Sequence, residues 1–381
     1  MTSNNKKTIP AFIGVASVWM GTHFGPGFAS GAQMNIYYVN YGLAGLFTPV
    51  IAMIILGVSL YFTMEYSRLN KLHNFKDYSS SLYSPFQKIM SPLFDFCYLF
   101  TVVCALGSCL AGIGSLLNSF LGIPYWVGIG FIIALIVLVC IFGSELVRVA
   151  SSYMVFFIIG ILLLIFILSF VYGDSDLAGS VANSAVNAKN PSLLAAIWSA
   201  VVYASFQATV ICNICSVTDT LVSKKESKKA TIAGIVGNLL MMTMSTILIF
   251  GYTNVFKVGS ATLPFYSIME RLNMPWLTLV YVVLVILAVT STGVGFIYSG
   301  ITRYGKLFKI ENTKVRDALI SIILLTACAC AASFGLTALV SKGFRVLGYL
   351  NLPIMILPAL FVASHKITKN YRKAHGLFVE E

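Results

Sequence analysis

The chain has 381 residues, of which 58% are hydrophobic and 10% are charged, and its formal net charge is +12. A soluble domain carries about 25% charged residues, so the composition excludes an ordinary soluble fold. The period-two alternation typical of membrane β-barrels is also absent. We therefore expect an all-α integral membrane protein.

Ten apolar stretches are long enough to cross a bilayer as helices of roughly 20 residues. They cover residues 9–38, 42–66, 89–120, 124–143, 147–172, 192–222, 230–253, 275–302, 317–338 and 344–364. An even number of spans places both termini on one side of the membrane. If that side is the cytoplasm, 20 of the 25 Lys and Arg residues lie in inner segments, as the positive-inside rule requires. We expect a multi-pass protein of the cell (inner) membrane with cytoplasmic N- and C-termini.

The first span is interrupted by Gly25-Pro26-Gly27. Proline removes an amide donor and clashes with the preceding turn, and glycine weakens a helix, so this helix is expected to break. In a membrane, freed backbone groups are tolerated only where protein or a watery cavity satisfies them. We expect the carbonyls of residues 21–24 and the amides of residues 27–30 to be available to a ligand. A proline kink packed against neighbouring helices is the alternative.

His23 lies just before this interruption and is the only histidine within a predicted span. An ionisable residue inside a membrane predicts a functional site, so His23 is a candidate to relay protons or to bind substrate. A neutral, structural histidine bonded to a backbone carbonyl is the alternative.

The connection at residues 173–191 separates two halves of five spans each, residues 9–172 and 192–364. Because each half has five spans, the second half starts from the opposite side of the membrane, so any repeat is inverted. Inverted repeats are typical of secondary transporters. We predict a single transmembrane transporter domain that covers residues 1–381.

The sixth span is unusually polar and contains neither glycine nor proline between residues 199 and 209, so local chemistry alone does not predict a break there. Its polar residues are expected to line a cavity or to bond between helices. The pair Cys212 and Cys215 lacks a second pair or a histidine at metal-site spacing, which favours packing over a metal or redox role.

The eighth span contains Ala288, Ser291 and Thr292. This spacing can place one carbonyl and two hydroxyls on one face of a helix, and oxygen ligands of this kind suit hard cations. Hydroxyls bonded back to the preceding turn are the alternative.

The run from Gly25 to Gly31 (GPGFASG) resembles the signature of the YkvI-like bacterial membrane proteins. These belong to the amino acid-polyamine-organocation transporter superfamily. The resemblance implies a LeuT-type fold: ten transmembrane helices in a 5+5 inverted repeat, with the first and sixth helices broken. It also implies a sodium site of five residues, formed by Gly21, Phe24, Ala288, Ser291 and Thr292. The chain departs from the family signature at two places. Pro26 stands where the family has a small residue, and Ala32-Gln33 stands where the family has Gln-Glu, so the carboxylate of that glutamate is absent here.

These patterns and the resemblance together predict a secondary active transporter of a small polar solute, an amino acid or amine, that works by alternating access coupled to sodium. The expected substrate-binding residues are His23, Gly25, Gly27, Phe28, Ala29, Ser108, Tyr203, Ser205, Phe206 and Gln207. Two alternatives stay open: a proton-coupled transporter that uses His23, and a non-transporting nutrient sensor or receptor component with the same fold. No enzymatic activity is expected, because His23 has no evident nucleophile or acid partner. The expected partners are a small-molecule substrate and the lipid bilayer, without nucleic acid. No cofactor is expected apart from a coupling sodium ion.

Overall fold

A computed structural model describes residues 10–141, 144–256 and 263–379 of the chain. The regular elements of these residues are helices and no strand occurs among them, which confirms the all-α prediction. Eight of the described helices are long and apolar enough to cross a membrane. Residues 9, 142 and 143, at the ends of two predicted spans, lie outside the described residues.

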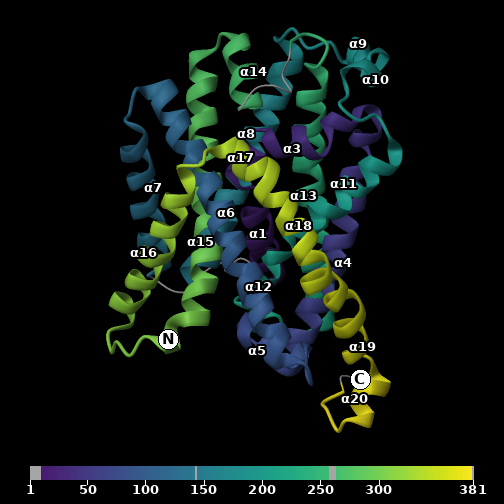
Figure 1. The fold of residues 1–381 in the computed structure, drawn as a ribbon, viewed down its shortest axis with the longest axis vertical. Helices are drawn as coiled ribbons and strands as arrows, with labels where there is room; N and C mark the ends of the chain where they lie inside the picture. The colour runs from purple at the N-terminus through teal and green to yellow at the C-terminus, as the bar shows by residue number, and fades with distance from the viewer. Residues whose placement is uncertain (1–9, 142–143, 257–262, 380–381) are drawn as a thin grey trace, which may run out of the picture.

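The first half of the chain begins with a segmented helix and continues with long ones (Figure 1). Its helices are α1 (Ala11–His23), α2 (Pro26–Ala29), α3 (Ala32–Tyr37), α4 (Thr48–Asn70), α5 (Phe75–Leu82), α6 (Gln87–Leu121), α7 (Tyr125–Cys140) and α8 (Ser144–Val171). A 3-10 segment, Val39–Leu46, joins α3 to α4.

The second half starts after two short helices, α9 (Leu177–Ala182) and α10 (Ser184–Asn187). Its helices are α11 (Leu193–Phe206), α12 (Val210–Cys215), α13 (Lys224–Gly251), α14 (Pro264–Leu272), α15 (Pro275–Tyr304) and α16 (Thr313–Ala332). The last span, Leu336–Lys366, contains α17 (Leu336–Ala338), α18 (Phe344–Asn351) and α19 (Ser364–Lys366), with π-helical turns between them. Helix α20 (Lys369–Ala374) follows.

The observed helices match the predicted spans in order. The two predicted spans outside the set of eight are the segmented first one and α7, an apolar helix of 16 residues. The total of ten spans therefore stays a prediction that depends on these two segments.

Helix α1 lies at the centre of the bundle, where it packs against α8, α13 and α15 (Figure 1). Its residues from Gly14 to His23 are all buried. Helix α13 approaches it closely because two of the α13 residues that face α1 are glycines. A Cβ atom at Gly234 would lie 2.1 Å from the Trp19 ring, and one at Gly237 would lie 2.1 Å from Met20 Sδ. Small residues at such positions let membrane helices pack without a gap.

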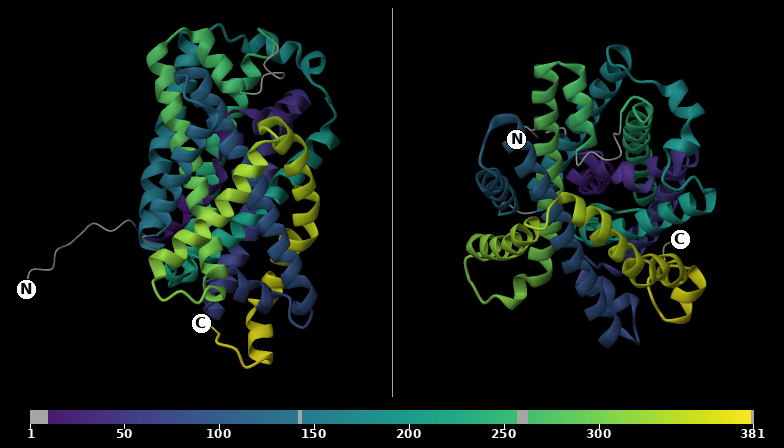
Figure 2. Two further views of the ribbon diagram at one scale, coloured as in Figure 1. Left: turned by 60° about the vertical axis from the view of Figure 1, so that its left-hand side comes forward. Right: turned by 45° about the horizontal axis from the view of Figure 1, so that its top comes forward.

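The basic connections gather at one end of the bundle (Figures 1 and 2). Helix α5, the connection between α15 and α16, and helices α19 and α20 lie at the lower end in Figure 1 and in the left panel of Figure 2, whereas α9, α10 and α14 lie at the upper end. The segments at the lower end carry many of the Lys and Arg residues assigned to the inner side. That this end faces the cytoplasm stays a prediction from the positive-inside rule.

Candidate functional site

The first helix breaks at the predicted place. Helix α1 ends at His23, and Phe24 has non-helical dihedral angles (φ −79°, ψ 54°), while α2 begins at Pro26. The carbonyl of Gly25 accepts the amides of Phe28 (2.9 Å) and Ala29 (2.8 Å). The expectation that these two amides would be available to a ligand was therefore wrong, because the short helix α2 uses them for its own first turn.

Protein groups satisfy the backbone on the far side of the break. Gly31 has a positive φ of 82° and bends the chain between α2 and α3. The Tyr281 hydroxyl donates to the Ala29 carbonyl (3.1 Å), and the Phe265 amide donates to the Ser30 carbonyl (3.1 Å). Irregular backbone at membrane depth requires such partners.

Residues of the expected cation site come together between α1 and α15. Thr292 Oγ1 donates to the Gly21 carbonyl (3.0 Å) and lies 3.3 Å from the Thr22 carbonyl. Thr292 thus bonds to the neighbouring helix, not to its own preceding turn. Ser291 lies directly against Gly21, since a Cβ atom at Gly21 would be 2.1 Å from Ser291 Oγ.

Ser291 Oγ is buried and has no hydrogen-bond partner among the described residues. Phe24 and Ala288 are also fully buried. An orphaned hydroxyl beside backbone carbonyls fits the oxygen donor set that a hard cation prefers. The residues present are therefore compatible with a sodium ion.

His23 contacts the second half of the chain through Tyr203. His23 Nε2 lies 2.8 Å from the Tyr203 hydroxyl, and His23 Nδ1 is buried without a hydrogen-bond partner among the described residues. The Tyr203 hydroxyl donates to Gln33 Oε1 (3.4 Å) and accepts from Gln207 Nε2 (3.4 Å). The observed partner of His23 is thus a side-chain hydroxyl, whereas the structural alternative assumed a backbone carbonyl.

A small cavity of about 20 Å³ lies beside this network. It is lined by Thr22, His23, Gly25, Gln33, Thr101, Ala105, Ser108, Cys109, Phe206, Gln207, Thr292, Phe296 and Phe344. This volume holds little more than one water molecule. A solute larger than water would therefore fit only if the surrounding helices separated.

The predicted substrate-binding residues differ in their positions relative to this cavity. His23, Gly25, Ser108, Phe206 and Gln207 line it. Two others lie next to the lining: Tyr203 bonds to His23, and the Phe28 ring meets the His23 ring edge-on at 6.0 Å. Two are directed elsewhere, since Ser205 Oγ donates to the Val201 carbonyl (2.7 Å) and the Ala29 carbonyl is taken by Tyr281. Gly27 lies within α2.

The sixth span tightens at the level of the cavity. Between α11 and α12, residues Gln207–Thr209 form a 3-10 turn in which the flanking dihedral angles stay right-handed. The span is thus interrupted without the unwinding seen at α1. A 3-10 stretch within a helix is a frequent mark of a hinge.

Several lining residues were not predicted from the sequence. Gln33, Thr101, Cys109, Phe296 and Phe344 come from four helices. Gln33 could have been predicted, because it is a polar residue that follows the break within the same membrane span. Thr101 and Phe344 stand in segments whose local pattern gives no sign that they face a cavity.

The chain matches a family model described as "Spore germination protein" over residues 43–333. No curated protein matches its sequence significantly. The narrower YkvI-like resemblance has no separate support from these comparisons.

Solved structures share the fold across nearly the whole chain. A mutant of the Eremococcus coleocola manganese transporter has 13% identity and a TM-score of 0.66, covering 99% of this chain and 85% of its own. MhsT in complex with L-phenylalanine has 12% identity and a TM-score of 0.65, covering 92% and 96%. A substrate-bound, outward-open Na⁺-coupled sialic acid symporter has 16% identity and a TM-score of 0.66, covering 93% and 79%. At these identities the comparison establishes the LeuT-type fold.

Proposed function

The chain belongs to the spore germination protein family, and from this premise we propose that it is a secondary active transporter that moves a small polar solute by alternating access. The observation that carries the proposal is the meeting of the broken helix α1 with α15 at a small closed cavity. Unpartnered polar atoms of His23 and Ser291 lie buried at this meeting point. The shared fold with solved transporters supports the same assignment.

The proposed solute is an amino acid. His23 is the only titratable acid or base among the cavity-lining side chains apart from the Cys109 thiol, and no carboxylate lines the cavity. A bare amine would enter without a counter-charge, and an unpaired charge is costly in such a site. A zwitterion carries its own counter-charge, so it fits better. Phe206, Phe296 and Phe344 supply apolar surface for its side chain.

The proposed coupling ion is sodium, held by the carbonyls of Gly21, Phe24 and Ala288 and the hydroxyls of Ser291 and Thr292. Because these groups belong to α1 and α15, bound sodium would hold the two helices together. Support comes from the Thr292 contact to Gly21 and from the unpartnered Ser291 hydroxyl. Proton coupling through His23 is the competing mechanism.

Uptake into proteoliposomes tests the transporter proposal. We expect accumulation of one or more radiolabelled amino acids when a sodium gradient is imposed and little accumulation when choline replaces sodium. Ser291→Ala combined with Thr292→Ala should abolish the sodium dependence. Thr290→Ala is the matched control. Thr290 directly precedes Ser291, and its hydroxyl is likewise buried without a hydrogen-bond partner among the described residues. Uptake driven equally by a proton gradient without sodium would contradict the sodium site.

A second candidate function is favoured by the family itself. A receptor component could use the same cavity to bind a nutrient without sustained flux. Such a protein would show saturable, ligand-dependent thermal stabilisation but no accumulation of that ligand in proteoliposomes. Binding accompanied by accumulation would exclude it.

A further inference from the structure

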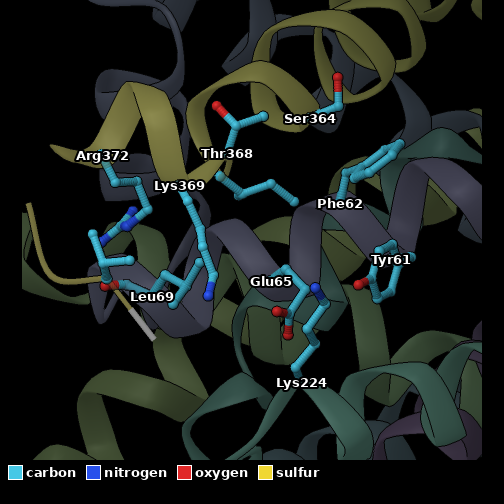
Figure 3. Close-up of a pocket in the computed structure, with 11 residues that line it drawn as sticks. Tyr61, Phe62, Glu65, Leu69, Lys224, Ser364, Thr368, Lys369 and Arg372 are labelled. Carbon is cyan, nitrogen blue, oxygen red and sulfur yellow. The ribbon is translucent and has the colours of Figure 1, made fainter. Parts of the chain in front are cut away.

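A second, larger cleft lies at the end of the bundle where α19 and α20 lie (Figure 1), and it shares no lining residue with the central cavity. Figure 3 shows this cleft in close-up. Its volume is about 530 Å³. It is lined by Tyr61, Phe62, Glu65, Leu69, Lys224, Ser364, Ile367, Thr368, Lys369, Arg372 and Val379. These residues come from the end of α4, the start of α13, and the segment around α19 and α20.

Two lysines point into this cleft from different helices. Lys224 begins α13, and Lys369 begins α20. Both side chains extend toward the space beside Glu65 (Figure 3). Neither forms an ion pair with another described residue. Glu65 does not neutralise them, because it already receives Arg68 through two bonds of 3.0 and 2.9 Å.

Arg372 adds a third cation to the cleft wall. Only 2% of its surface is exposed, so its charge is largely removed from solvent. Its guanidinium donates to Asn70 Oδ1 (3.2 Å), the Leu69 carbonyl (3.3 Å) and the Phe378 carbonyl. All three acceptors are neutral. Lys224, Lys369 and Arg372 thus have no anionic partner among the described residues. Because buried charges are normally paired, this cleft is suited to an anionic ligand.

Part of the cleft wall is apolar. Tyr61, Phe62 and Ile367 form part of its wall. Phe361, about one turn before Ser364 on the last span, is 69% exposed. An exposed phenylalanine on a membrane-spanning helix is suited to contact acyl chains. The site thus combines a cationic cleft with an adjoining apolar surface.

We propose that this cleft binds the phosphate headgroup of an anionic phospholipid. Lys224 and Lys369 contact the phosphate, Arg372 provides a fixed positive field, and an acyl chain lies along Phe361. Basic pockets at the ends of membrane helices recognise anionic headgroups in this way. A bound lipid would link α4, α13 and the segment after the last span.

Thermal unfolding of the purified full chain in neutral detergent tests this site. The probes are phosphatidylglycerol, phosphatidylcholine with the same acyl chains, and inorganic phosphate alone. We compare the unaltered chain with Lys224→Gln/Lys369→Gln. The matched control is Lys306→Gln/Lys309→Gln, which removes two exposed lysines from another connection at the same end. The lysines of the cleft are chosen instead of Arg372 because their loss should not disturb folding.

Phosphatidylglycerol is expected to raise the unfolding temperature more than phosphatidylcholine does. The concentration required should rise roughly 30-fold in Lys224→Gln/Lys369→Gln, since each basic residue near an anionic surface contributes about 1 kcal/mol and about 1.4 kcal/mol is tenfold. The control variant should retain the response. Equal loss in both variants, or no preference for phosphatidylglycerol, would overturn the proposal. Full stabilisation by inorganic phosphate alone would also overturn the proposal, because the ligand would then be free phosphate and not a lipid.

Discussion

His23 Nδ1 and Ser291 Oγ are buried near the break in α1 and lack partners among the described residues. Leaving a buried polar atom unpaired costs about 1–3 kcal/mol. Most buried polar atoms in proteins are paired, so each exception calls for an explanation. Here the two atoms belong to the residues proposed to meet the solute and the ion. A bound solute and a bound ion that interact with these two atoms would offset the energetic cost of leaving them unpaired.

The first residue-scale prediction concerns the bond between His23 and Tyr203 (2.8 Å). Tyr203→Phe should destabilise the fold by about 1–3 kcal/mol, because it leaves both ring nitrogens of His23 unpaired. Replacing both partners with apolar residues, as in His23→Leu/Tyr203→Phe, should recover most of that loss. Thermal unfolding of the two single variants and the double variant measures the coupling. Strictly additive effects would show that the bond does not contribute to stability.

A second prediction follows from the contact between Gly21 and Ser291. Gly21→Ala should destabilise the fold by about 1–3 kcal/mol, as overpacking does, because the new Cβ would lie 2.1 Å from Ser291 Oγ. Adding Ser291→Ala removes that atom and leaves Val155 Cγ2 at 3.2 Å and the Cβ of residue 291 at 3.4 Å as the nearest atoms, so it should restore most of the stability. Gly160→Ala is the control, since nothing lies within 4 Å of its Cβ position. Unfolding temperatures in one detergent provide the comparison.

At the scale of elements, ion pairs join segments that lie far apart in the sequence. Arg303 of α15 pairs with Asp95 of α6, with Nε donating to Oδ1 at 3.0 Å, and these side chains are 14% and 20% exposed. Arg271 of α14 pairs with Asp174 near the other end of the bundle, but these side chains are 40% and 50% exposed. Burial determines how strongly the loss of one partner is felt, because water screens exposed charges.

The third prediction compares these two pairs. Asp95→Asn should destabilise the fold by about 1–3 kcal/mol, since it leaves the Arg303 charge poorly solvated between α6 and α15. Asp174→Asn should change stability by at most about 1 kcal/mol. Chemical denaturation of each variant at low and high salt measures both effects. Similar losses for the two variants, with the same salt dependence, would contradict the role assigned to burial.

The elements also show which features of the site a sequence can predict. The break at α1 was predictable because proline and glycine prevent a continuous helix by their own chemistry. The 3-10 turn at Gln207–Thr209 was not, because those residues carry no local breaking signal and the turn depends on packing. The use of the Phe28 and Ala29 amides within α2 was likewise invisible, since it depends on how the chain resumes its helix after Gly25.

At the scale of the whole molecule, composition and hydropathy predicted the helical membrane fold, and the resemblance implied its LeuT-type arrangement. The cavity was only half predictable. His23, Gly25, Ser108, Phe206 and Gln207 were expected to meet a solute and do line it. Thr101 from α6 and Phe344 from α18 join them through tertiary packing alone. Nothing in the local sequence of α6 or α18 indicates which neighbouring helices these two side chains will face.

The closed cavity leads to a prediction for the molecule as a whole. Cys109 lines the cavity and is buried, so it can report on opening. In a chain whose other cysteines are replaced by serine, a water-soluble methanethiosulfonate reagent should modify Cys109 slowly while sodium and solute hold the helices closed. Removing both should increase the rate at least tenfold, because the proposed alternating-access cycle exposes this cavity to water.

A chain that keeps only Cys140 controls for general loosening. Cys140 is equally buried but lies outside the cavity lining, with its thiol 3.8 Å from the Val294 carbonyl. Its modification should stay slow in every condition. Equal rates at Cys109 with and without ligands would mean that opening is not coupled to binding. A matching increase at Cys140 would indicate unfolding. Selective modification of Cys109 would show that the helices around the break separate as the proposed transport cycle requires. Separation of these helices exposes the Cys109 thiol to the reagent but leaves the Cys140 thiol buried.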